Sequence, residues 1–152
     1  MKILAFILSV MSFFAFAGET SKTVPILYDY SHIYDYKIIR VIDGDTIQFE
    51  MPGLPIELGD KMSLRIFGID TPEKGFRAKC DGEAKTGQLA TDFAQKIVVA
   101  AKSKKIILIS WDKFGGRVLG DLVLDGKSFR TLMLDSGYAR EYHGDAKLSW
   151  CK

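Results

Sequence analysis

The sequence contains little of the material from which several common kinds of site are built. Among its 152 residues are only two cysteines and two histidines, and Cys80, Cys151, His32 and His143 do not have the spacing of a zinc site. The chain also lacks a strong positive charge, since 21 Lys and Arg face 19 Asp and Glu. The whole-chain charge therefore gives no support for nucleic-acid binding, and any such site must be local.

The sequence has no apolar run of the roughly 20 residues that a membrane-spanning helix needs. The run Ile3–Ala17 follows Lys2, is 15 residues long and ends in a small-x-small pattern before Gly18. These features are typical of a secretory signal peptide, so we expect residues 1–17 to be cleaved. A membrane anchor is the alternative, and a lipoprotein is disfavoured because the residue directly after the cleavage site is Gly18 and not a cysteine. Removing 17 of the 152 residues leaves 135, the size of one domain.

Export of the chain would decide the chemical state of its two cysteines. An even number of cysteines in an oxidising compartment favours a disulfide, so the sequence predicts a bridge between Cys80 and Cys151. Two free thiols are the alternative. The bridge would close a loop of 71 residues, which the chain-entropy model values at about 4 kcal/mol of stability.

The part of the chain after residue 35 begins with three predicted strands. Two β-rich runs within residues 36–51 flank Asp43-Gly44, a favoured pair for a two-residue hairpin turn. A third predicted strand covers residues 61–69 and ends at Asp70. Residues 18–35 form a tyrosine-rich lead-in that we expect to cover part of the folded domain, with an aromatic platform for nucleic acid as the alternative.

The period of the hydrophobic residues changes over residues 82–101. Leu89, Phe93 and Ile97 are spaced four apart, as on one face of a helix. Asp81 is the predicted N-cap of this helix. The basic residues that follow it suit a helix C-terminus, and they are Lys102, Lys104 and Lys105.

Two further strands are predicted over residues 105–111 and 117–124, the second closed by the turn Asp125-Gly126. Residues 127–137 predict a short helix that ends at its last residue, a glycine. We expect the tail, residues 138–152, to be irregular.

The predicted order is thus three strands, a helix, two strands and a helix. Strands joined by tight turns, with the helices set apart, favour an α+β, mainly β, fold built on a small and partly open barrel. The pattern alone leaves another α+β sandwich as the alternative.

Three short stretches carry the candidate site. In VIDGDT, Asp45 follows the predicted turn, where turn chemistry does not require a second carboxylate. An EF-hand loop starting at Asp43 is excluded, because Gln48 and Leu54 stand where that loop needs Gly and Glu.

The second stretch, LRIFGIDTPEKG, places three ionisable residues around one strand end, namely Arg65, Asp70 and Glu73. On a regular strand the first two would face opposite sides, but Gly68 between them is suited to a bulge. In the third stretch, WDKFGGRVLG, two glycines before Arg117 allow the backbone to approach a ligand closely. Each stretch alone is more often an ordinary turn or a solvated strand.

Together, IDGDT, LRIFGIDTPE and DKFGGR, in this order, resemble the staphylococcal nuclease (thermonuclease) family over about residues 36–150. The resemblance implies a five-stranded OB-fold barrel with two or three helices. It divides the chain into a signal peptide at 1–17, a lead-in at 18–35 and a nuclease domain at 36–152.

The resemblance also assigns roles to individual residues. Asp45, Asp70 and the carbonyl of Thr71 are the implied Ca²⁺ ligands, with Asp43 supporting them. Arg65 and Arg117 are the implied phosphate clamp, and Glu73 the residue that activates or positions the attacking water. Possible substrate contacts are Lys113 and Tyr142. DKFGGR departs from the staphylococcal enzyme by one extra Gly before the arginine, and by a Phe in place of Tyr at position 114.

The implied function is a secreted or periplasmic, monomeric, Ca²⁺-dependent nuclease that cleaves DNA and RNA and leaves 3′-phosphate ends. Lys74, Arg77 and Lys79 lie in the loop after the predicted third strand, where steering of phosphate and an ordinary solvated face are equal alternatives. The alternative for the whole protein is a non-catalytic OB-fold module that binds nucleic acid or another protein. A glycan-binding toxin or adhesion component is a weaker one.

Overall fold

The computed structural model describes residues 32–151. The predicted signal peptide and residues 18–31 of the lead-in lie outside the described residues. Within the described range, no helix combines the length and the apolar character needed to cross a bilayer.

Over residues 32–151, the chain forms five strands of five or more residues and two α-helices. The longer strands are β2 (Ile38–Asp43), β3 (Thr46–Glu50), β4 (Lys61–Ile66), β6 (Lys104–Trp111) and β7 (Arg117–Leu124). The short ones are β1 (Ile33–Tyr34), β5 (Ile69–Asp70), β8 (Lys127–Ser128) and β9 (Arg140–Glu141). The helices are α1 (Asp81–Ala100) and α2 (Phe129–Asp135), with single 3₁₀ turns η2 (Ile56–Leu58) and η3 (Gly75–Arg77).

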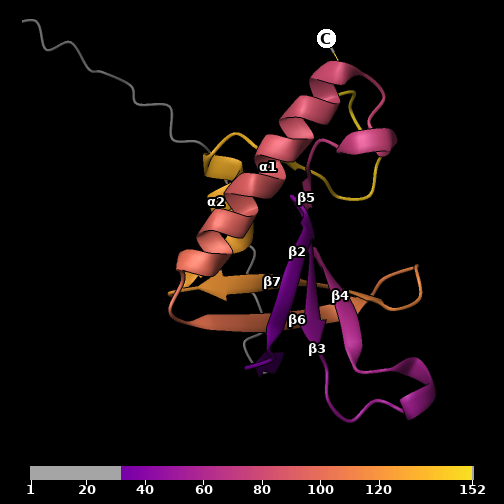
Figure 1. The fold of residues 1–152 in the computed structure, drawn as a ribbon, viewed down its shortest axis with the longest axis vertical. Helices are drawn as coiled ribbons and strands as arrows, with labels where there is room; N and C mark the ends of the chain where they lie inside the picture. Colours follow the sequence, from indigo (N-terminus) through magenta and orange to yellow (C-terminus); the bar gives the residue numbers. More distant parts are fainter. Residues whose placement is uncertain (1–31, 152) are drawn as a thin grey trace, which may run out of the picture.

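The main sheet has the strand order β1-β6-β7-β4-β3-β2, with β8 attached to β7. All its pairs are antiparallel except β4 and β7, which run parallel. Figure 1 shows β2, β3 and β4 running across the direction of β6 and β7, with α1 packed beside β2. This mainly-β architecture with two helices confirms the predicted fold class.

The core is built by alternation along the strands. On β4, Met62, Leu64 and Ile66 are buried, whereas the two residues between them, Ser63 and Arg65, are only partly covered. Strands of period two divide their side chains between two faces in this way. The core is completed by residues from both helices, among them Ala90, Ala94, Val98, Phe129 and Met133. Because of the alternation along β4, the Arg65 side chain lies on the face of the strand that points away from the core.

The first hairpin is confirmed, but its turn is displaced by one residue. Asp43 pairs with Thr46, so the two turn residues are Gly44 and Asp45 rather than Asp43 and Gly44. The pairing register between β2 and β3 shifts between Val41 and Asp43, and this irregularity accommodates the displaced turn. Asp45 therefore belongs to the turn itself and does not follow it.

The predicted third strand is interrupted at Gly68, where the sequence predicts a possible bulge. After β4 the chain turns at Phe67 and Gly68, the latter with a φ of 78°, a conformation that glycine adopts at little cost. The two residues of β5 then pair with β9 in a separate two-stranded sheet. The prediction of an irregular tail is accordingly wrong at residues 140–141.

The helices differ from the prediction mainly at their starts. Cys80, not Asp81, is the N-cap of α1, and its Sγ accepts a hydrogen bond from the amide of Glu83. The second helix begins two residues late because β8 occupies Lys127–Ser128, and Ser128 caps it. After α1, Lys104 donates to the carbonyl of Ala101 at 2.5 Å.

The described end of the lead-in does cover the barrel. β1 pairs with β6, and the ring of Tyr34 stacks on Tyr36, which stacks in turn on buried Phe49. Lys105 pairs with Asp35 in this segment instead of serving the helix end.

Candidate active site

The turn between β2 and β3 meets the segment after β5, and this contact brings the first two candidate stretches together. A Cβ on Gly44 would lie 2.9 Å from Thr71 Oγ1, so only glycine permits the approach. Asp45 is buried and accepts three hydrogen bonds. The Thr71 amide and hydroxyl reach its Oδ2 at 3.0 and 2.8 Å, and the Thr46 hydroxyl reaches its Oδ1 at 3.1 Å. The Asp45 carboxylate is consequently fixed between two elements.

Arg65 lies between the two candidate metal-binding carboxylates. Its guanidinium forms an ion pair with Asp45, lies 3.8 Å from Asp70 Oδ1 and donates to the carbonyl of Ile69 at 3.1 Å. Burial lowers the pKa of Arg65 from its ordinary value, and the charges of nearby carboxylates, including Asp70, oppose that shift. One guanidinium therefore spans both carboxylates.

Asp70 is buried at the end of β5 and is contacted by the tail. Trp150 Nε1 donates to its Oδ2 at 3.0 Å, and Lys147 Nζ lies 2.6 Å from its Oδ1. Despite that ion pair, Oδ1 has no hydrogen bond of good geometry from the described residues. A buried carboxylate oxygen that lacks a hydrogen-bond donor is suited to binding a cation.

The donor set at this point consists of hard oxygens. Two buried carboxylates, Asp45 and Asp70, are held within one guanidinium's reach, and the backbone of Thr71 is hydrogen bonded to the first. Calcium and similar cations prefer carboxylate and carbonyl oxygens, whereas zinc prefers nitrogen and sulfur. The residues present therefore fit a Ca²⁺ ion.

Glu73 is partly exposed beside these carboxylates, with 36% of its side chain accessible. Arg77 Nε lies 3.5 Å from one of its oxygens, and Lys147 Nζ lies 3.7 Å from the other. Arg77 also reaches Asp43 Oδ2 at 3.1 Å, and Asp43 Oδ1 accepts the Asp45 amide at 3.3 Å. Asp43 thus links the turn to Glu73 through Arg77.

The backbone of Glu73 is placed by two residues of α1. A Cβ on Gly87 would lie 2.3 Å from the Glu73 carbonyl oxygen, so the helix touches this segment directly. Buried Glu83 accepts the Lys79 amide at 2.7 Å and the Glu73 amide at 3.4 Å. Glu83 therefore closes the loop that begins at Glu73.

Replacing Gly87 with Ala is expected to destabilise the protein. Within a helix this change normally stabilises by up to about 1 kcal/mol, but here the added methyl would collide with the backbone of Glu73. Gly82→Ala is the matched control, because a Cβ at Gly82 meets nothing within 4 Å. Thermal unfolding measures both, and a melting temperature for Gly87→Ala at or above that of Gly82→Ala would contradict the contact.

Arg117 stands on the same outer face as Arg65. β4 and β7 are parallel, and Arg65 pairs with Leu119, two residues after Arg117, so both arginines project from one side. The Arg117 guanidinium pairs with Asp112 and lies 4.6 Å from the ring centre of Phe114.

The DKFGGR stretch has one glycine more before Arg117 than the staphylococcal enzyme, and both of its glycines lie in the hairpin loop between β6 and β7. Gly116 has a φ of 72°, and its carbonyl accepts the Ser63 amide at 3.0 Å. The backbone start of β7 is therefore in register with β4 despite the insertion. Lys113 lies in the same loop, with its Nζ 5.4 Å from the ring centre of Phe114.

Tyr142 is half-buried beside the turn between β4 and β5. Its amide donates to the carbonyl of Gly68 at 3.0 Å, and Lys147 Nζ lies 5.9 Å from its ring centre.

The structure thus gathers Asp43, Asp45, Arg65, Asp70, Thr71 and Glu73 in direct or shared contacts. It places Arg117 and Lys113 on the neighbouring loop and Tyr142 next to the tail.

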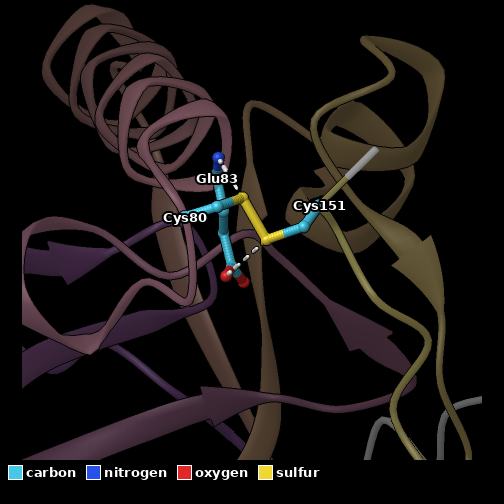
Figure 2. A group of neighbouring side chains, drawn as sticks. All are labelled: Cys80, Glu83 and Cys151. Atoms are coloured by element: carbon cyan, nitrogen blue, oxygen red, sulfur yellow. Dashed lines mark hydrogen bonds between the residues drawn. A yellow bond between two sulfur atoms is a disulfide. The ribbon is translucent and has the colours of Figure 1, made fainter.

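The disulfide predicted from the cysteine count is present and joins the start of α1 to the end of the tail (Figure 2). Cys80 and Cys151 have Cα atoms 6.0 Å apart, and Cys151 Sγ lies 3.9 Å from Glu83 Oε2. Because the two sulfurs are bonded to each other, this cluster does not offer the thiolates of a zinc site.

Four residues of the site were not found from the sequence, namely Glu83, Gly87, Lys147 and Trp150. Glu83 stands three residues after the N-cap, the spacing of a capping box, and this signal was available. The other three carry no local signal, because their partners lie far away in the sequence.

Comparisons with known proteins identify the family of the chain. A family model described as staphylococcal nuclease homologue matches residues 63–149, more than half of the chain. A thermonuclease of Staphylococcus hyicus is 32% identical over 110 residues, which are 69% of this chain and 57% of that protein. The chain therefore spans less than two thirds of the length of this relative. The family match includes Arg65, Asp70, Glu73 and Arg117, whereas Asp45 precedes it. On these grounds the chain belongs to the staphylococcal nuclease family.

Proposed function

We propose that the protein is a secreted, Ca²⁺-dependent nuclease that hydrolyses phosphodiester bonds of DNA and RNA. One observation carries the proposal, made in a member of the staphylococcal nuclease family. Arg65 lies between two buried carboxylates, Asp45 and Asp70. Beside them stands a third carboxylate, that of Glu73, which is partly exposed. Charged groups of both signs thus surround one point of the surface, as the anionic substrate and its nucleophile require.

Asp45, Asp70 and the Thr71 carbonyl would hold the cation. When bound there, Ca²⁺ supplies positive charge that offsets the charge of the phosphodiester, most strongly as that charge increases in the transition state. Asp43 supports this arrangement by accepting the Asp45 amide.

Arg65 and Arg117 would bind the phosphate. They project from the same face of two paired strands, and a planar guanidinium holds two phosphate oxygens at once. Arg117 is oriented for this by Asp112 and by the ring of Phe114. We also propose that Lys113 and Tyr142 contact the flanking parts of the substrate.

Glu73 would orient the attacking water and accept its proton. Its partial exposure lets a water molecule reach it, and Arg77 and Lys147 hold the carboxylate from two sides. The water oxygen forms a bond to phosphorus while the bond to the 5′ oxygen breaks. The departing 5′ oxygen takes up a proton from bulk water, and Glu73 releases the proton it accepted back to water, so that the products are a 5′-hydroxyl and a 3′-phosphate.

Export follows from the predicted signal peptide at residues 1–17, and the Cys80–Cys151 disulfide is compatible with it because such bonds persist in oxidising compartments. We propose that the protein acts as a monomer in the periplasm or in the medium.

The test is digestion of circular plasmid DNA by the purified protein, with Ca²⁺ and with a chelator. We expect Ca²⁺-dependent conversion to nicked and linear forms, which chelation abolishes. The ends are then examined for 3′-phosphate, and an RNA substrate is compared with DNA.

The absence of cutting by a folded protein that binds Ca²⁺ would contradict the proposal. Tight, Ca²⁺-independent binding of an oligonucleotide without turnover would instead identify a non-catalytic binding module.

A further inference from the structure

The tail after β9 returns to the site and ends at the disulfide. We call residues 143–151 the strap. Its last residue is bonded to Cys80 at the start of α1, and Arg140 contacts the two residues directly before it. The Arg140 guanidinium donates to the carbonyl of Ser149 at 3.0 Å and lies 3.6 Å from the ring centre of Trp150. The last three residues of the strap are therefore fixed close to Asp70.

Two side chains of the strap contact the two oxygens of Asp70 separately. Trp150 Nε1 donates to Oδ2 at 3.0 Å, and Lys147 Nζ lies 2.6 Å from Oδ1. The Asp70 side chain is only 7% exposed, so few other partners can reach it. The contacts differ in kind: the indole N–H fixes the orientation of the carboxylate, whereas the ammonium group places a charge on it.

We propose that the strap sets the cation affinity of Asp70, with Trp150 as a positioning residue and Lys147 as a competitor of the cation. This inference rests on the Ca²⁺ site of the proposed function. It goes further by assigning two residues with opposite effects on that site.

Trp150 favours binding because a ligand oxygen that is already oriented loses less freedom when the cation binds. Hydrogen bonds of this kind to metal ligands change metal affinity 10- to 100-fold when removed. With Oδ2 occupied by the indole, Oδ1 is the oxygen of Asp70 presented to the cation.

Lys147 opposes binding because it occupies that same oxygen. Calcium ligands lie about 2.3–2.6 Å from the ion, and the ammonium nitrogen stands 2.6 Å from Oδ1. Two cations at this distance from one oxygen repel each other, so each weakens the binding of the other. Lys147 is 44% exposed and can move towards Glu73, whose Oε1 is 3.7 Å away.

The experiment is a Ca²⁺ titration of the ¹⁵N-labelled protein followed by NMR, which reports affinity without activity. The Thr71 amide donates to Asp45, and the Trp150 indole N–H donates to Asp70, so both signals respond to cation binding at this site. Trp111, which is 64% exposed, provides the second indole signal and the internal reference.

Two variants are predicted to move the dissociation constant in opposite directions. Trp150→Phe removes the N–H donor and keeps an aromatic ring for Arg140, and we expect about tenfold weaker binding. Lys147→Met keeps the length of the side chain and removes the charge that repels the cation, so we expect about tenfold tighter binding. Trp111→Phe and Lys127→Met are matched controls on exposed positions and should leave the affinity unchanged.

A strap with a merely structural role would give weaker binding in both variants or no change in either, and both results would overturn the inference. If Trp150→Phe does not fold, Lys147→Met decides alone, since tighter binding has no structural explanation. Absence of Ca²⁺ binding by the unmodified protein would overturn the proposed metal site, and the inference with it. Ca²⁺ binding that the two variants do not shift oppositely would overturn the inference only.

Discussion

Replacing Glu73 with Gln is expected to lower the rate of phosphodiester hydrolysis at least about 100-fold while the protein stays folded. Glutamine keeps the size of the side chain but neither carries the negative charge nor accepts a proton, and a positioned general base contributes roughly 10²–10⁴-fold to a rate. The measurement is the initial rate of cleavage of a defined DNA substrate at saturating Ca²⁺, with Glu57→Gln as the control on the exposed turn η2.

Loss of stability should not account for that effect. The Glu73 side chain is 36% exposed, and its ion pairs with Arg77 and Lys147 span 3.5 and 3.7 Å. Exposed pairs of this kind contribute at most about 1 kcal/mol, so the melting temperature should change by a few degrees only. A near-normal rate in the folded variant would remove Glu73 from the mechanism and assign activation of the water to another group.

The parts of the fold that were predictable are those with a local cause. The helix α1 follows from residues spaced four apart, and the strands β6 and β7 follow from apolar runs bounded by turn residues. The convergence of Arg65 and Asp70 also had a local signal in Gly68, although the structure uses it to end one strand and start another.

The displaced turn shows the limit of such local signals. Asp43-Gly44 is a good turn pair, and the sequence offered no reason to prefer Gly44-Asp45. The choice is made by Thr71, against which Gly44 packs and to which Asp45 is hydrogen bonded. A residue far along the chain therefore decides which carboxylate stands in the turn.

The short strand β9 within the tail was not predicted for the same reason. Arg140 and Glu141 form β9 because Asp70 and Ile69 offer an unpaired strand edge, not because the tail has a strand pattern of its own. Trp150 reaches Asp70 across 80 positions of sequence. Contacts of this range appear only once the disulfide and the fold have been specified.

Reducing or removing the Cys80–Cys151 disulfide is expected to lower the free energy of unfolding by about 4 kcal/mol, the value of the chain-entropy model for a loop of this length. The cysteines are 71 positions apart, so the bridge restricts the unfolded chain over about half its length. For a domain of this size the loss corresponds to a fall of roughly 10–20 °C in melting temperature. The measurement is denaturant unfolding of the oxidised protein, the reduced protein and the Cys80→Ser, Cys151→Ser double variant.

The double variant also separates the effect of the bridge from that of the reductant. Reductant should destabilise the unmodified protein and leave the double variant unchanged. Equal stability of the oxidised protein and the double variant would show that the contacts of the strap, such as Arg140 with Ser149, hold it without the bridge. A loss near the expected value would show that the bridge acts as the chain-entropy model describes, by restricting the unfolded chain.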